Sequence, residues 1–290
     1  MKIKVDPSNP FNLEVTLCCG QAFRWEKKGE WWYGVASDRV FKSRQTSGIL
    51  EIENVDIDFA KRYFGLNDEL DNVYSRICKD RYIKRAVEIF SGLRILRQDP
   101  WECLISYICA TYKNIAAIKH MLFNVSRRFG DKVRFDGFDF YTFPPVENLA
   151  RASLNDLLQC GLGYRTKYVQ ETARTVAESH VDFDHLRKMD YKEAKRELMS
   201  LPGVGPKAAD CILLFSLEKL QSFPVDVWIR RAILRHYAAH FSREFIARLR
   251  EKESLAGSDY EKLSMFGRTY FGEFAGYAQE YLFHYERTGG

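Results

Sequence analysis

The stretch from Leu201 to Arg231 constrains the fold of this 290-residue chain more than any other, because a glycine-rich turn there lies between helix signals. Two glycines within L-P-G-V-G (201–205) allow positive φ and leave the backbone uncovered, so another backbone can approach closely. Pro206 suits the first position of a helix, where its missing N–H costs nothing. We therefore expect a hairpin at 201–205, a buried helix over about 207–218, and a second helix capped by Asp226.

This stretch also carries the residues that could do chemistry. The free N–H groups of the hairpin and of the helix start behind it can bind one phosphate without regard to base sequence. Lys207 lies in the first helical turn, where the macrodipole and burial disfavour its ammonium form, so it is a candidate amine nucleophile. Asp226 follows nineteen positions later (226 − 207). The ordinary alternatives are a solvated surface lysine and an aspartate that only caps a helix.

The motif L-P-G-V-G-P-K-A-A-D-C, followed by P-V-D-V, resembles the helix-hairpin-helix DNA glycosylase superfamily, which has a Gly/Pro-rich loop and a catalytic aspartate. In its lyase members the lysine attacks the sugar C1′ and the aspartate assists. The resemblance thus gives these roles to Lys207 and Asp226. It implies DNA contacts from the hairpin backbone, at Gly203, Val204 and Gly205.

Cysteine spacing bears on cofactors. No cysteine follows Cys211, which excludes the four-cysteine iron–sulfur cluster of the endonuclease III branch. There is no spaced Cys/His set for zinc either. We expect no metal and no other cofactor, and we expect the seven cysteines to be reduced.

Two further motifs resemble eukaryotic-type 8-oxoguanine DNA glycosylase. In G-Q-A-F-R-W, Gly20 matches the glycine whose carbonyl accepts a hydrogen bond from N7–H of the oxidised base. In A-Q-E-Y-L-F, Gln279 and Phe283 lie one helical turn apart, where an amide can read a base edge and a ring can stack on its face. Cys211 lies one turn after Lys207, and the family pairs these as thiolate and ammonium. The alternatives are a strand with a glycine bulge, aromatic core packing and a plain buried cysteine.

The loop G-L-G-Y-R (161–165) resembles the family loop that wedges a tyrosine beside the lesion and reaches the orphaned cytosine with an arginine. Tyr164 and Arg165 match, although a loop of this composition can also be merely solvated. The chain departs from the family pattern elsewhere. Tyr112 replaces the asparagine that fills the gap left by the flipped base, Ala117 replaces a second cytosine-reading arginine, and Trp228 replaces a histidine.

The overall pattern predicts an α+β chain. Residues 1–97 form an N-terminal antiparallel β domain with some helices, TATA-binding-protein-like by resemblance, and 98–290 form an all-α helix-hairpin-helix glycosylase domain. We expect strands at 11–17, 31–36, 49–52 and 92–98, and a helix start at Asp99-Pro100. A C-terminal helix over 267–286 should bury an aromatic stripe, composed of Phe274, Tyr277, Tyr281 and Tyr285.

The charge surplus of five is compatible with a polyanionic partner. No run of eighteen apolar residues and no apolar leader is present, so we expect an intracellular monomer, cytoplasmic in a prokaryote and nuclear in a eukaryote.

Taken together, the resemblances imply a bifunctional enzyme that flips 8-oxoguanine out of double-stranded DNA. It would cleave the glycosidic bond through a Schiff base on Lys207 and nick the strand by β-elimination. One alternative is a non-catalytic helix-hairpin-helix DNA-binding module, which has no reason to keep Lys207 with Asp226. The other is an alkylbase glycosylase of the same superfamily, which normally lacks the lysine.

Overall fold

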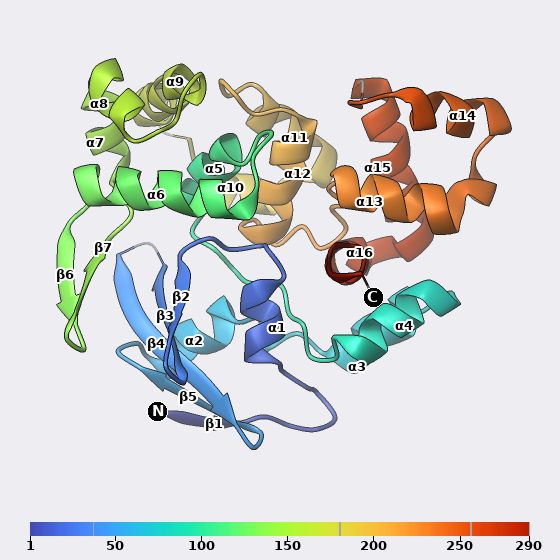
Figure 1. The fold of residues 1–290 in the computed structure, drawn as a ribbon, viewed down its shortest axis with the longest axis horizontal. Coiled ribbons are helices and arrows are strands. Elements are labelled where there is room, and N and C mark those ends of the chain that lie inside the picture. The colour runs from blue at the N-terminus through green and yellow to red at the C-terminus, as the bar shows by residue number, and fades with distance from the viewer. Residues whose placement is uncertain (37, 180, 256, 290) are drawn as a thin grey trace.

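The computed structural model describes residues 1–36, 38–179, 181–255 and 257–289. Within these ranges the N-terminal part is built on a five-stranded antiparallel sheet with the order β1-β5-β4-β3-β2 (Figure 1). The strands are β1 (Lys2–Lys4), β2 (Trp25–Lys28), β3 (Trp31–Ala36), β4 (Arg39–Thr46) and β5 (Ile49–Glu53). The accompanying helices are α1 (Leu13–Cys18), α2 (Ile57–Tyr63), α3 (Leu70–Ile77) and α4 (Arg81–Ile89).

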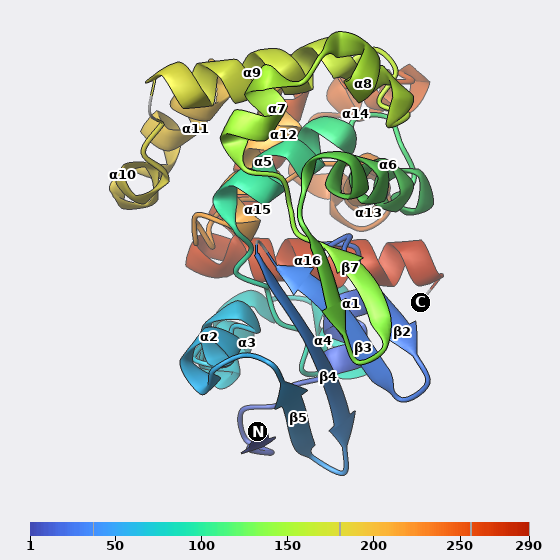
Figure 2. The same cartoon turned by 90° about the vertical axis from the view of Figure 1, so that its left-hand side faces the viewer.

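The remainder is mostly helical, and the α+β class is confirmed. Its helices are α5 (Pro100–Cys109), α6 (Ile115–Phe129), α7 (Val146–Arg151), α8 (Leu154–Gln159), α9 (Arg165–Ser179), α10 (Phe183–Lys188), α11 (Tyr191–Met199), α12 (Pro206–Phe215), α13 (Val227–Ala232), α14 (Arg243–Glu251), α15 (Gly257–Phe271) and α16 (Ala275–Thr288). A π turn (Ile233–Tyr237) continues α13. Figure 2 shows α16 running between the other helices of this part and the N-terminal part.

The predicted strand at 11–17 is wrong, because this segment forms α1. The Asn12 side chain accepts a hydrogen bond from the Val15 N–H and so caps the helix. Leu13, Thr16 and Leu17 are buried, and their spacing of three and four residues suits one helix face as well as the alternation suits a strand. The strands expected at 31–36 and 49–52 are confirmed as β3 and β5.

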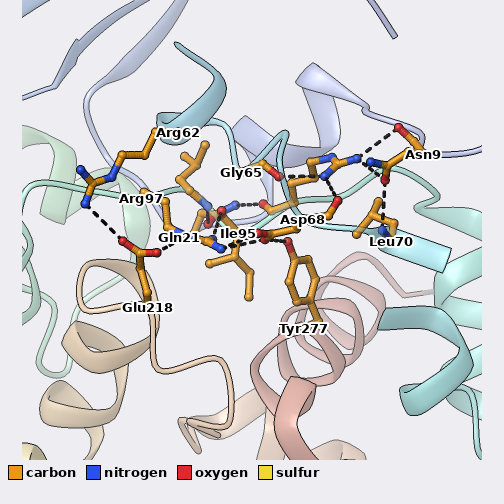
Figure 3. A network of polar contacts seen from close by, with 12 residues as sticks. Asn9, Gln21, Arg62, Gly65, Asp68, Leu70, Ile95, Arg97, Glu218 and Tyr277 are labelled. Carbon is orange, nitrogen blue, oxygen red and sulfur yellow. Dashed lines mark hydrogen bonds and ion pairs between the residues drawn. The ribbon is translucent and has the colours of Figure 1, made fainter. Parts of the chain in front are cut away.

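The strand predicted at 92–98 is also wrong. The backbone of this segment pairs with side chains and with carbonyls at the ends of α2 and α12 instead of a sheet edge. The Gln21 side chain accepts from the Leu96 N–H and donates to the Arg94 carbonyl, both at 2.8 Å. Asp68 then pairs with Arg97 at 2.7 Å and accepts from the Tyr277 hydroxyl of α16, as Figure 3 shows. This polar network ties the connection between the two parts to α16.

The prediction that 98–290 is wholly helical is wrong at one hairpin, formed by β6 (Lys132–Phe135) and β7 (Phe138–Tyr141). The hairpin lies against the N-terminal sheet (Figure 2). Phe140 stacks on Tyr33 with ring centroids 5.8 Å apart, and Asp136 at the turn accepts from Tyr33 and Lys42 at 2.5 and 2.6 Å. The hairpin therefore fastens the helical part to the sheet.

The C-terminal segment is two helices rather than one helix over 267–286. Gly272 adopts φ +77° and starts a 3-10 turn that separates α15 from α16. The predicted aromatic stripe is partly confirmed, since Tyr277 and Tyr281 are fully buried while Phe274 and Tyr285 are only half-buried. One hydrophobic cluster includes residues of α3, α4, α5, α12 and α16, which places α16 where the two parts of the chain meet. No helix within the described ranges is long and apolar enough to cross a membrane.

Candidate active site

The predicted helix-hairpin-helix unit consists of α11, residues 200–205 and α12. The Val204 N–H donates to the Leu201 carbonyl at 3.2 Å. Gly203 has φ +79°, and a Cβ there would lie only 2.7 Å from Cβ of Tyr168, so the position requires glycine. Gly205 is extended and exposed, and it precedes Pro206 at the first position of α12. The hairpin backbone therefore reaches the surface at the start of α12.

A buried aspartate that sequence reasoning missed holds α12 in place. Asp210 is fully buried and accepts from the hydroxyls of Tyr191 and Tyr260, both at 2.5 Å, and from Lys195 at 3.0 Å. These partners belong to α11 and α15, so α12 is bonded to helices on two sides. An aspartate between Ala209 and Cys211 on an apolar helix is the signal that could have revealed this anchor.

The structure confirms that Asp226 caps α13. Its Oδ1 accepts from the backbone N–H groups of Trp228 and Ile229 at 3.0 and 2.9 Å. Burial raises the pKa of Asp226, while the two N–H groups and the positive charge of Lys207 act in the opposite direction. Lys207 and Asp226 are therefore close enough to interact electrostatically.

The Lys207 amine stands in the first turn of α12, as predicted. Its Nζ lies 5.3 Å from the ring centroid of Tyr107, and it forms no ion pair with any residue that the structure describes. The amine is half-buried and is not held by a carboxylate. This arrangement suits a nucleophile that must reach a substrate carbon.

Cys211 lies one turn after Lys207, but its predicted thiolate state is not favoured. Burial raises the pKa of this thiol to about 12, and the positive charge of Lys207 offsets only part of that effect. Cys211 is thus a neutral, buried thiol in this structure.

Gly20 and Phe283 come together from opposite ends of the chain. Gly20 has φ +105°, and a Cβ at this position would lie 3.2 Å from Cε1 of Phe283 and from Cδ1 of Ile115. Gln279 is only 4% exposed, and its Oε1 has no hydrogen-bond partner among the described residues. Because α16 packs on α13, the predicted base-reading residues lie beside the helix that Asp226 caps. An unpaired buried acceptor is costly unless a ligand supplies a donor.

Outside the hairpin, the three side chains predicted to contact the duplex differ in exposure. Tyr112 is 84% exposed and has φ +52°, a conformation that costs a bulky residue energy. Tyr164 is exposed too. Arg165, however, is only 2% exposed, because its guanidinium donates to the Thr111 carbonyl and lies 4.3 Å from the Tyr164 ring centroid. Arg165 therefore supports the loop that presents Tyr112.

The other two departures lie in first helical turns. Ala117 is half-buried in α6, where its N–H donates to Asn114 at 2.9 Å. Trp228 is half-buried at the start of α13, and the guanidinium of Arg231 lies 4.6 Å from its ring centroid. A cation thus stands beside Trp228, in the first turn of the helix that Asp226 caps.

Two family models match nearly the whole chain. The model of the 8-oxoguanine DNA glycosylase N-terminal domain matches residues 2–104, and the model of the HhH-GPD superfamily base excision DNA repair protein matches residues 105–253. The match to residues 105–253 places the chain in the HhH-GPD superfamily, and the match to residues 2–104 identifies the family within that superfamily. The chain belongs to the 8-oxoguanine DNA glycosylase family within the HhH-GPD superfamily.

Individual relatives agree with this assignment. The chain is 33% identical to a probable N-glycosylase/DNA lyase of Methanothermobacter thermautotrophicus, over 98% of this chain and 96% of that protein. It is 33% identical to N-glycosylase/DNA lyase OGG1 of Arabidopsis thaliana, over 93% and 76% of the two chains. The 8-oxoguanine glycosylase/lyase of Clostridium acetobutylicum, solved with double-stranded DNA containing cytosine opposite 8-oxoguanine, superposes with a TM-score of 0.86 at 32% identity, covering 96% and 92%.

Proposed function

We propose that this chain is a bifunctional DNA glycosylase and AP lyase that removes 8-oxoguanine from double-stranded DNA. The observation that carries the proposal is the pairing of Lys207 with Asp226. Lys207 is half-buried at the start of α12, has no ion-pair partner in the described ranges, and lies within electrostatic reach of the half-buried Asp226. In a family whose members are named N-glycosylase/DNA lyases, this is the arrangement that a lysine nucleophile requires.

In the proposed reaction the Lys207 amine attacks C1′ while the bond from C1′ to N9 of the base breaks. The amine loses a proton, and the bond from C1′ to the ring oxygen O4′ then opens, with O4′ taking up a proton, to give an iminium ion between C1′ and the lysine nitrogen. The iminium ion acidifies C2′, and loss of a C2′ proton expels the 3′ phosphate by β-elimination. Asp226 stabilises the positive charge that develops on the sugar and orients the amine. Its two backbone hydrogen bonds hold the carboxylate in one orientation while the reaction proceeds.

The surface around the site suits a flipped-out nucleotide. The exposed hairpin backbone at Gly205 would bind a phosphate of the lesion strand. Tyr112 would stack in the gap that the base leaves, and Tyr164 would wedge beside it. Gly20, Gln279 and Phe283 would read and stack on the base, and Cys211 would pack against its other face as a neutral thiol.

Base release from a duplex with 8-oxoguanine opposite cytosine tests this proposal. The wild type should release the free base and nick the strand without alkali, whereas Lys207→Gln should do neither. Lys192→Gln is the matched control, because Lys192 is exposed on α11 of the same helix-hairpin-helix unit. Binding of the duplex without base release by the wild type would instead support a non-catalytic binding module.

A further inference from the structure

Glu280 is a buried carboxyl that the proposed reaction does not use. It is 3% exposed, and its Oε2 has no hydrogen-bond partner among the described residues. It follows Gln279, whose Oε1 is likewise buried and unpaired. Two consecutive residues of α16 therefore bury oxygen atoms that lack donors, which a folded protein avoids unless something else binds there.

The residues that influence the Glu280 carboxyl come from the Gly20 segment and from the helices that form the candidate active site. Cys19, which directly precedes Gly20, forms a hydrogen bond with the Glu280 side chain. Arg287, further along α16, interacts with Glu280 through its charge. Lys207 on α12 and Asp226 at the start of α13 interact with the carboxyl electrostatically. The charge of Glu280 also acts to raise the pKa of Tyr107 on α5 and of Cys211 on α12. Glu280 is thus coupled both to the Gly20 segment and to the Lys207–Asp226 pair.

The five-membered ring of the oxidised base carries its groups in the same order as the residues near Glu280. N7–H stands at one end, where the Gly20 carbonyl is expected to accept it, and N9 stands at the other, bonded to the sugar carbon that Lys207 attacks. The oxygen on C8 lies between them. Glu280, which interacts with Cys19 beside Gly20 and with Lys207, belongs to the group of residues that would surround that oxygen.

We propose that Glu280 reads the oxidised edge of the flipped base, donating a hydrogen bond from its neutral carboxyl group to the oxygen on C8. The inference rests on the proposed function and adds a second contact to the atoms that distinguish 8-oxoguanine from guanine. It assigns recognition of N7–H to Gly20 and recognition of the C8 oxygen to Glu280.

The protonation state of Glu280 decides whether this contact forms. The pKa of Glu280 is raised to about 7, chiefly by burial and also by the charge of Asp226, although the Cys19 hydrogen bond, Arg287 and Lys207 act in the opposite direction. Below that pH the neutral group can donate, whereas the carboxylate has only acceptor atoms and repels the C8 oxygen. The contact should therefore weaken as the pH rises above 7.

Single-turnover excision from an 8-oxoguanine:cytosine duplex between pH 6 and pH 9 tests the proposal. Glu280→Gln keeps a donor at every pH, so the ratio of the wild-type rate to the Glu280→Gln rate should fall about tenfold for each pH unit above the pKa. Glu280→Ala should be slow at every pH. Glu286→Gln is the matched control, a buried glutamate of α16 paired with Arg235 and His236, and its profile should follow the wild type.

A second substrate separates base recognition from general damage to the site. An abasic duplex has no base to read, so Glu280→Ala should cleave it at the wild-type rate. A wild-type to Glu280→Gln ratio that does not change with pH, or equal losses on both substrates, would overturn the assignment to Glu280. A wild type that cleaves the abasic duplex but does not release 8-oxoguanine would refute the proposed function instead.

Discussion

Replacing Glu280 with glutamine should change how stability depends on pH, and this effect can be measured without DNA. The pKa of Glu280 is raised from 4.5 to about 7, chiefly by burial. Between these values the unfolded chain binds fewer protons at this residue than the folded chain does, so the free energy of unfolding falls as the pH rises. One pKa unit corresponds to about 1.36 kcal/mol, so a difference of about 2.5 lowers the free energy of unfolding by about 3 kcal/mol between pH 4.5 and pH 8.

Urea unfolding of the wild type, Glu280→Gln and Glu286→Gln at several pH values measures this term. Because glutamine does not titrate, Glu280→Gln should gain stability relative to the wild type by about 3 kcal/mol between pH 4.5 and pH 8. Glu286 is already ion-paired, so its variant should show no such gain. Parallel stability curves for the wild type and Glu280→Gln would refute the claim that Glu280 is held neutral by burial.

Three further predictions concern the site. Asp226→Asn should keep its melting temperature, since asparagine caps about as well as aspartate, while losing most single-turnover excision; an unfolded variant would instead favour a purely structural cap. Gln279→Ala should slow 8-oxoguanine excision far more than it weakens binding to undamaged duplex, measured at matched salt; equal losses would mean that Gln279 is core. Excision of 8-oxoguanine opposite cytosine should be only weakly favoured over excision opposite the other three bases, because Ala117 cannot hydrogen-bond through its side chain and Tyr112 can stack on any base. Ala117→Arg should sharpen the preference for cytosine. A steep cytosine preference in the wild type would show that other residues read the orphaned base.

The parts of the site that could be predicted from the sequence are those encoded by adjacent residues. Pro206 at a helix start, the glycine at 203 and Asp226 as a cap each act within a few positions, and each appears as expected. The meeting of Gly20 with Phe283 spans almost the whole chain, and only the resemblance to a family indicated it.

The errors arose where tertiary partners decide between local alternatives. The segment 11–17 fits both a strand and a helix, and the Gln45 side chain of β4, which accepts from the Leu13 N–H at 2.7 Å, pairs the backbone at the helix start. The extended segment 92–98 looks like a strand because the sequence does not show that Gln21 takes its hydrogen bonds. The sequence also does not show that Arg165 is buried, since its burial depends on the Thr111 carbonyl, which approaches from another loop. The sequence carries one indication that Glu280 is unusual, because it is the only charged residue in the segment A-G-Y-A-Q-E-Y-L-F.

Borohydride trapping tests the central claim, that Lys207 is the nucleophile, most directly. A duplex containing 8-oxoguanine opposite cytosine is incubated with the protein and sodium borohydride, which reduces an imine to a stable amine. The wild type and Lys192→Gln should form a covalent protein–DNA adduct, and peptide mapping should locate the sugar on Lys207. Lys207→Gln should form none. Adduct at the wild-type level in Lys207→Gln, or a crosslink mapped to another residue, would contradict the account.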